Sequence, residues 1–131
     1  MSRSKINFTC LRNGAREYRI QWLPRDEIQE LGADLELENP CAIVCHLSNT
    51  IYLSEHLQQF PLRALEALWH EKYHILEDVT GVATEGGWPE GLVDCVAIQD
   101  IALLIQSGVF RLEDISIAGV PLIKKSHKAK N

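Results

Sequence analysis

Two histidines with helical spacing are the residues of this chain whose types and positions could support chemistry. His70 and His74 are four residues apart in His70-Glu71-Lys72-Tyr73-His74, so on an α-helix both rings project from one face and can share one metal ion. Neutral imidazole nitrogens are common ligands of zinc. Glu71 is rotated off that face, where its carboxylate can take a proton from a metal-bound water. The pentapeptide therefore predicts a zinc site with Glu71 as the general base.

Two histidines do not complete a catalytic zinc site, which usually takes three protein ligands and keeps a fourth position open. The best candidate for the third ligand is Glu90, at the start of a second predicted helix. The link Gly86-Gly87 precedes this helix and can let it fold back against the first. Asp94 is one helical turn beyond Glu90 on the same face. We expect it to accept the free ring N–H of a ligating histidine, with His70 favoured.

Two other glutamates compete for the third position. Glu77 follows His70 by seven residues and shares its face, but three ligands in a row on one straight helix cannot surround an ion tetrahedrally. We therefore expect Glu77 to be solvated or to lie behind the ligands. Glu85 lies in the link between the helices and is the runner-up third ligand.

The remaining cysteines and histidines are not expected to form a second metal site. Cys41 and Cys45 point to the same side of a predicted strand, with His46 beside them. No second pair of ligands matches them, so we expect reduced thiols in the core. His46 and His56 are expected to be structural or exposed, and His127 to be solvated.

Apolar alternation predicts strands in the first half of the chain. One hairpin is expected at 6–10 and 18–22 with Asn13-Gly14 at its turn, and a second extended pair at 41–47 and 50–53. A short helix is expected at 25–31 and a further strand at 34–38.

The second half has apolar residues three and four apart, which predicts helices. The first helix begins at Pro61 and ends before Gly81, and the second begins at Pro89 and ends at Ser107-Gly108. Residues 109–120 are expected to form an edge strand or a packing arm. Strands followed by helices predict an α+β domain, in which the first long helix carries the histidines and the second carries the third ligand.

Length and composition fit one globular domain. The chain has 131 residues, of which 46% are hydrophobic and 24% are charged. We expect the domain to span 1–120 and a basic, disordered tail to span 121–131. The net charge is −5, and the lysines of the tail leave the rest of the chain more acidic still. An acidic body argues against nucleic acid as the main partner.

Membrane insertion and export are not expected. No stretch approaches the roughly 20 apolar residues of a membrane span, and the first residues show no secretory signal. We therefore expect a cytoplasmic protein without a membrane partner, whose 4 cysteines are reduced.

The pentapeptide and the downstream Glu90-x-x-x-Asp94 resemble zinc metallopeptidases of the gluzincin type. Over nearly its whole length the chain looks like the compact single-domain zincins of phage and prophage genomes, loosely related to the ImmA/IrrE group. The resemblance implies a zincin-like fold with His70, His74 and Glu90 as ligands, Glu71 as general base and Asp94 behind the ligands. It also implies the cytoplasm of a bacterium or of a phage-infected host cell. The metzincin branch is excluded, because Glu77 stands where that branch needs glycine.

The expected function is zinc-dependent hydrolysis of a peptide bond in a selective protein or peptide substrate, with a regulatory protein as the expected class. Two alternatives stay open. One is a catalytically silent regulatory or protein-binding module, since Lys72 stands where such peptidases usually have an uncharged residue. The other is a domain with a purely structural zinc. Tyr52, Tyr73 or a histidine could stabilise the developing oxyanion, and the oligomeric state is left open.

Overall fold

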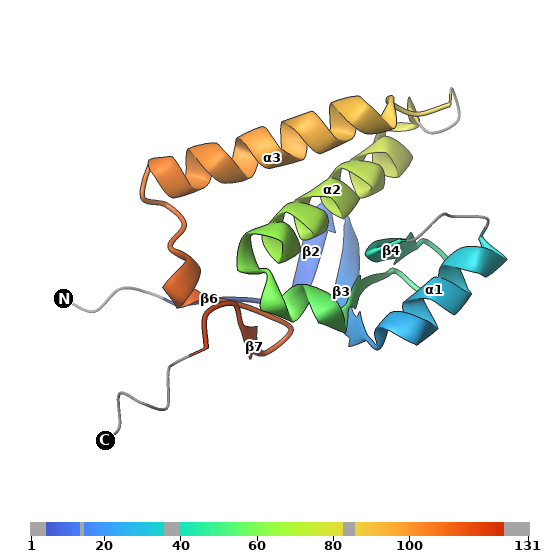
Figure 1. Ribbon diagram of the computed structural model, residues 1–131. Helices are drawn as coiled ribbons and strands as arrows, with labels where there is room; N and C mark the ends of the chain where they lie inside the picture. Colours follow the sequence, from blue (N-terminus) through green and yellow to red (C-terminus); the bar gives the residue numbers. More distant parts are fainter. Residues whose placement is uncertain (1–4, 14, 36–39, 83–85, 125–131) are drawn as a thin grey trace, which may run out of the picture.

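The chain folds as an α+β domain in which strands precede the two long helices (Figure 1). The computed structural model describes residues 5–13, 15–35, 40–82 and 86–124. Its strands are β1 (Ile6–Phe8), β2 (Cys10–Asn13), β3 (Arg16–Leu23), β4 (Ala42–Cys45), β5 (Thr50–Ser54), β6 (Ile115–Ile117) and β7 (Val120–Pro121). Its helices are α1 (Arg25–Asp34), α2 (Pro61–Thr80) and α3 (Glu90–Gln106), with 3-10 turns η1 (Glu55–Gln59) and η3 (Leu112–Asp114). The α+β prediction is confirmed.

Four strands form the sheet beneath α2, in the order β2-β3-β5-β4. The two predicted antiparallel pairs are present, β2 with β3 and β4 with β5. A parallel pairing of β3 with β5 joins them. Strand β5 is central, and its Ile51 and Leu53 are fully buried. Strand β4 is left at the edge of this sheet.

The first predicted strand divides in the structure, which corrects the hairpin expected at 6–10. Only β2 pairs with β3, whereas β1 leaves this sheet and pairs in parallel with β6. The division falls at Thr9, whose carbonyl accepts the backbone N–H of Ile20 at 3.1 Å. Strand β6 also pairs with β7, so part of the segment 109–120 is a central strand of a second, three-stranded sheet.

The expected boundary between domain and tail was too early. Pro121 pairs with Ser116 in β7, and Leu122 is buried in the core. Both residues therefore belong to the fold. The segment 125–131 lies outside the described residues.

Helix α1 is longer than expected, and the strand predicted at 34–38 is wrong at its start, since Asp34 is the last residue of α1. The helix continues through Gly32 because this glycine packs directly on Pro40, where a Cβ atom would clash with the proline ring. Gly32 is thus explained by its close approach to the ring of Pro40, and it does not mark the end of the helix. Residues 36–39 lie outside the described part of the chain.

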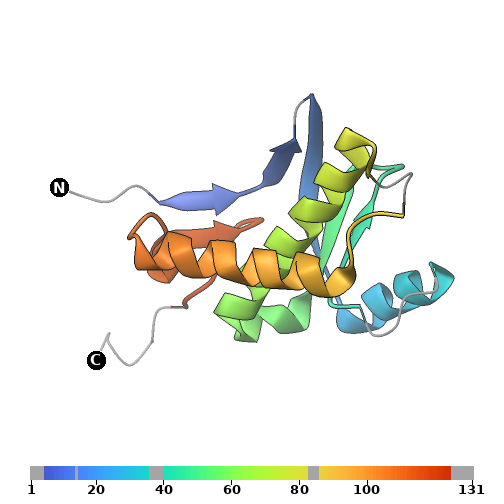
Figure 2. The same ribbon diagram turned by 90° about the horizontal axis from the view of Figure 1, so that it is seen from above.

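Helix α2 lies between α3 and the four-stranded sheet (Figures 1 and 2). It begins with Pro61 at the first helical position and ends at Gly81, whose φ of 84° is left-handed, as predicted. Its buried apolar face includes Ala64, Leu65, Leu68 and Ile75. The other face of α2 stays free to carry polar side chains.

An aromatic cluster packs α2 against two segments that lie far apart in the sequence, one near Phe8 and one near Phe110. The ring of Trp69 lies 5.8 Å from the ring of Phe8 and 5.5 Å from that of Phe110, in edge-to-face contacts. This cluster fixes the helix directly beside His70. None of the helices in the described part of the chain combines the length and apolar character of a membrane span.

Candidate metal centre

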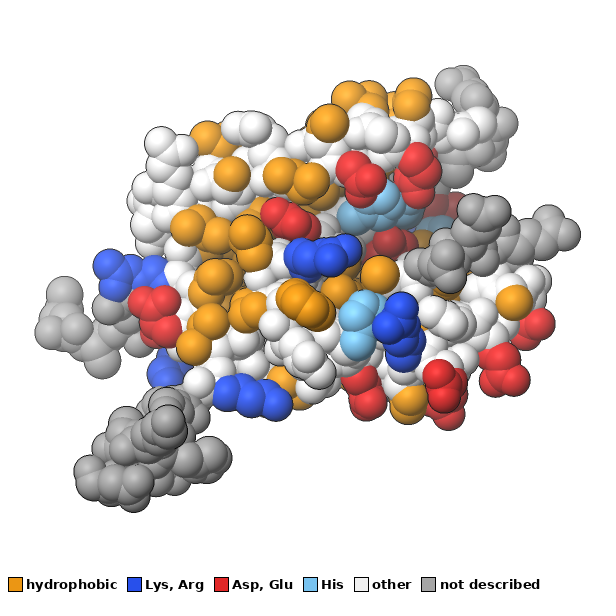
Figure 3. Space-filling model, viewed as in Figure 1, with side chains coloured by type: hydrophobic (Ala, Val, Ile, Leu, Met, Phe, Trp, Pro, Cys, Tyr) orange, Lys and Arg blue, Asp and Glu red, His pale blue; other side chains and the backbone are white. Residues whose placement is uncertain are grey.

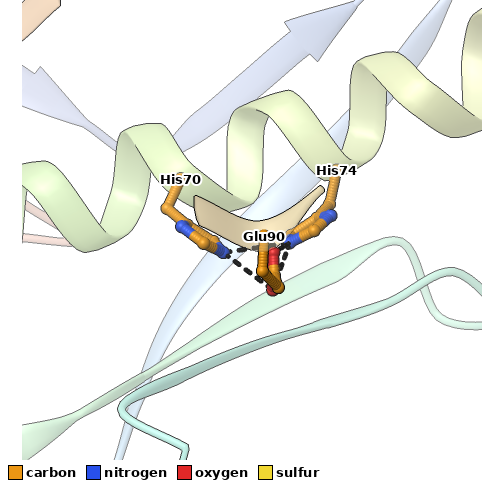
Figure 4. A group of neighbouring side chains, drawn as sticks. All are labelled: His70, His74 and Glu90. Carbon is orange, nitrogen blue, oxygen red and sulfur yellow. Dashed lines mark hydrogen bonds and ion pairs between the residues drawn. The ribbon is translucent and has the colours of Figure 1, made fainter. Parts of the chain in front are cut away.

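The structure brings together the three residues that the sequence suggested as ligands. His70 and His74 project from one face of α2, and Glu90 reaches them from the first residue of α3 (Figure 4). The two Nε2 atoms are 3.0 Å apart, and Oε1 of Glu90 lies 3.3 Å from that of His70 and 3.2 Å from that of His74. One potential ligand atom from each residue lies within 4.8 Å of the others. This group could hold a metal ion.

The segment between the helices delivers Glu90 to the histidines. Gly86 and Gly87 have φ values of 101° and 73°, a region that side-chain-bearing residues rarely adopt. Pro89 follows, and α3 begins at Glu90. The link thus contacts α2 at Trp88, and Glu90 follows two residues later at the start of α3.

Asp94 occupies the place behind His70 that the sequence suggested. The Nδ1 atom of His70 donates to Oδ1 of Asp94 at 2.6 Å. This bond fixes the proton on Nδ1, so Nε2 keeps its lone pair for a metal.

Glu77 holds the other histidine. The Nδ1 atom of His74 donates to Oε1 of Glu77 at 2.5 Å, and Oε2 of Glu77 accepts the backbone N–H of Trp88 at 2.6 Å. A Cβ atom at Gly87 would clash with the same carboxylate. Glu77 is therefore buried behind the ligands and is not solvated. The spacing of three residues from His74 was a visible signal of the contact with this histidine, whereas no local pattern indicated the bond to the inter-helix link.

The carboxylate of Glu71 lies beside the two histidines. Glu71 is 7% exposed, and its Oε2 is 3.9 Å from Nε2 of His70. Burial raises the pKa of the Glu71 carboxyl well above its ordinary value, and the charges of Glu90 and Asp94 raise it further. A carboxyl group in this environment has a strong affinity for a proton, as a general base requires.

Lys72 does not belong to the group. Its ammonium lies 5.5 Å from the ring centre of Trp69 and 5.0 Å from that of Tyr73, and it is not among the residues that line the cavity at the histidines. The Tyr73 hydroxyl donates to Asp100. Burial is the larger cause and this hydrogen bond is the second, and together they raise the pKa of Tyr73 to about 12. Both side chains thus serve the packing of α2.

A cavity of about 730 Å³ opens at the candidate metal centre. Strand β4 contributes Ile43 and Val44 to its wall, and α2 contributes Glu71 and the two histidines. Helix α3 contributes Glu90, Asp94, Ala97 and Ile98. Figure 3 shows histidine side chains at a hollow on this face, with acidic side chains beside them. The centre is therefore accessible to a ligand larger than water.

His46 lines a second cavity, of about 380 Å³, together with His74 and Glu90. Its Nδ1 atom lies 2.7 Å from the hydroxyl of buried Tyr18. His56 lies apart, with Nδ1 2.5 Å from the Ser54 hydroxyl. The sequence predicted that both histidines are structural or exposed. It did not indicate that His46, unlike His56, lines a cavity with His74 and Glu90.

The cysteines form no second centre within the described residues. All 4 are free, and Cys41 and Cys45 are partly buried and not fully in the core. Hydrogen bonds with Ser48 lower the pKa of the Cys45 thiol. Glu85 and His127 lie outside the described residues.

Comparisons with protein-family models, with curated proteins and with solved structures gave no match.

Proposed function

We propose that this protein is a zinc-dependent metallopeptidase that hydrolyses a peptide bond in a selective protein substrate, with Glu71 as general base. One observation carries the proposal: His70, His74 and Glu90 converge within 4.8 Å in an accessible cavity that Glu71 also lines. A group that only bound metal for structure would not need a cavity or a further buried carboxylate beside it.

The donor set supports zinc as the ion. It offers two imidazole nitrogens and one carboxylate oxygen, whereas calcium and magnesium prefer oxygen ligands alone. Both Nδ1 atoms are engaged by carboxylates, at 2.6 Å in His70 and 2.5 Å in His74. The two Nε2 atoms are therefore the ligand atoms, and three protein ligands fit a catalytic zinc that keeps one position open.

The residues around the ion would divide the work of amide hydrolysis. Zinc, when bound, polarises the scissile carbonyl and acidifies a water molecule. Glu71 takes the proton of the attacking water and later passes it to the leaving amine. Asp94 and Glu77 hold the imidazole rings of His70 and His74 in place throughout.

The wall of the cavity supports an extended peptide as the substrate. Strand β4 is at the edge of its sheet, and within the described residues its outer side has no paired strand. Ile43 and Val44 of this strand line the cavity. A peptide in extended conformation can hydrogen-bond to such an edge while its carbonyl lies over the metal centre. A protein segment is the class of substrate that suits this arrangement.

A second donor, besides zinc, would stabilise the developing oxyanion. Of Tyr52, Tyr73 and the histidines, His46 suits this role best. Tyr73 is bound to Asp100, and Tyr52 lies within the sheet on β5. His46 shares a cavity with His74 and Glu90.

We propose the cytoplasm as the compartment, which the free state of all 4 cysteines supports.

A comparison of Glu71→Gln with the parent protein tests the proposal. Both proteins are loaded with zinc and incubated with peptides and regulatory proteins from a bacterial cytoplasm, and cleavage is followed by mass spectrometry. The parent should cleave, and Glu71→Gln should lose about 10²–10⁴-fold in rate while its zinc content stays the same. Equal cleavage by both proteins would exclude Glu71 as the base. Full biological effect of Glu71→Gln would instead identify a protein-binding module that needs no turnover.

A further inference from the structure

Glu66 is the carboxylate of the main cavity that the proposed chemistry does not use. Four acidic residues line this cavity, namely Glu66, Glu71, Glu90 and Asp94. Glu90 contacts both histidines, and Asp94 holds His70. Glu71 is assigned the proton transfer. Glu66 has none of these roles, yet it lies in the same cavity.

The position of Glu66 is fixed relative to the metal centre. It precedes His70 by four residues on α2, so both side chains project from one face of the helix. Four residues of helix correspond to about 6 Å along the axis. This distance is comparable to the length of a lysine or arginine side chain, so a substrate residue next to the metal can reach Glu66.

The carboxylate of Glu66 is in no salt bridge within the described part of the chain, although Arg63, three residues earlier on α2, also lines the cavity. Glu66 is partly buried, and no hydrogen bond or ion pair within 4 Å involves its carboxylate there. Burial raises its pKa, and the positive charge of Arg63 opposes this effect. The guanidinium of Arg63 lies 6.0 Å from the ring centre of Phe60, one turn nearer the start of α2. A cation that enters the cavity can form the direct ion pair that Glu66 does not make with Arg63.

Apolar side chains line the same cavity as this carboxylate. Ala67, Ala97 and Ile98 line it from the two helices. Lysine and arginine combine an apolar stem with a cationic end, so their stems can lie on these groups while the charge meets Glu66. A leucine side chain would gain the apolar contacts alone, and an acidic side chain would be repelled.

We propose that Glu66 is a specificity-determining residue that selects substrates with lysine or arginine beside the scissile bond, on the His70 side of the metal centre. This inference rests on the proposed function. It narrows the substrate from any extended peptide to one with a basic residue at a defined place.

Amino-acid hydroxamates test the inference without a known substrate. Arginine, leucine and glutamate hydroxamate share a zinc-binding group and an α-amino group and differ only in the side chain. Their dissociation constants for the zinc-loaded protein are measured by calorimetry. Arginine hydroxamate should bind about fivefold more tightly than leucine hydroxamate, the effect of a partly exposed ion pair, and glutamate hydroxamate should bind most weakly.

Two variants should move this preference in opposite directions. Glu66→Gln should reduce the ratio of arginine to leucine affinity to about one, and Arg63→Gln should increase it, because the competing cation is removed. Glu55→Gln is the control, since this exposed glutamate lies outside the lining of the cavity. Zinc content should stay unchanged in all three variants, and Glu55→Gln should also keep the affinity of the parent for both arginine and leucine hydroxamate.

The outcomes separate the inference from the function on which it rests. Equal binding of arginine and leucine hydroxamate to the parent, or an unchanged preference in Glu66→Gln, would overturn the role of Glu66 and leave the metallopeptidase proposal intact. Absence of hydroxamate binding to a zinc-loaded parent would overturn both.

Discussion

The Nδ1 atom of His74 lies 2.5 Å from Oε1 of Glu77, a carboxylate that is 5% exposed. The second oxygen of Glu77 accepts the N–H of Trp88 in the link that leads to Glu90. One buried group therefore orients a histidine and also fixes the segment that carries the third ligand. The corresponding partner of His70 is Asp94, whose side chain is 64% exposed. His74 is thus oriented by a buried carboxylate, whereas His70 is oriented by an exposed one.

Glu77→Gln should weaken zinc binding more than Asp94→Asn. Loss of a carboxylate behind a ligating histidine typically costs about 10- to 100-fold in metal affinity, and the change at Glu77 also disturbs the bond to Trp88. We expect the upper part of this range for Glu77→Gln and the lower part for Asp94→Asn. Competition with a chromogenic chelator measures both constants. A larger loss in Asp94→Asn would show that the buried carboxylate is not the main support.

The ligand residues should be distinguishable from the other histidines by metal content. His70→Ala, His74→Ala and Glu90→Ala should each lower bound zinc severely, because each removes one of three protein ligands. His46→Ala and His56→Ala are the matched controls and should keep full zinc. Elemental analysis after dialysis against trace zinc gives the stoichiometry. Full zinc in Glu90→Ala would remove α3 from the centre even if both histidine variants lose the metal.

Glu71 should make the stability of the metal-free protein depend on pH. Burial raises the folded-state pKa of this carboxyl above its usual value of 4.5, so its contribution to stability is complete below that value. It is lost as pH rises through the raised folded-state pKa. Glu71→Gln cannot ionise, so the parent should lose stability relative to this variant as pH increases. Urea unfolding at several pH values, with a chelator present, measures the difference, and Glu55→Gln serves as the control. Parallel curves for the parent and Glu71→Gln would contradict the assigned burial effect.

Removal of the metal should leave the domain folded. The hydrophobic core is built from residues such as Tyr18, Ile51, Leu68 and Ile117, and the metal ligands are not part of it. Chelation should therefore lower the melting temperature without loss of far-ultraviolet circular dichroism. A ligand at about 100 times its dissociation constant stabilises a protein by about 2.7 kcal/mol, which sets the expected scale. Unfolding on chelation would favour a purely structural zinc.

The parts of the structure that were predicted correctly depend on local periodicity. Apolar spacings of three and four, as at Leu62, Leu65 and Trp69, define α2, and the same helical geometry places His74 beside His70. The start of α3 at Glu90 followed from Pro89 in the same way. These features depend on neighbouring residues, so a single sequence contains the necessary information.

The errors arose where distant residues decide the structure. Ile6 and Phe8 alternate like a hairpin strand, but their partners are Ile115 and Ile117, and no local pattern specifies this pairing. Gly32 appeared to end a helix, whereas its contact with Pro40 requires a glycine within it. The burial of Glu77 likewise depends on the path of the link to Trp88.

The pairing of β1 with β6 ties the beginning of the described chain to its end. Gly119 donates its N–H to the side chain of Asn7 across a separation of 112 residues, and Trp22 donates to the carbonyl of Ile117 across 95. Helix α3 ends at Gln106 and β6 begins at Ile115, so both long helices precede β6 in the order of synthesis. Ile6 and Phe8 therefore lack their sheet partner until almost all of the described chain has been made. Because contacts of high sequence separation form slowly, we expect closure of the three-stranded sheet to be a late step of folding, which also completes the contacts of Trp69 with Phe8 and Phe110 beside His70.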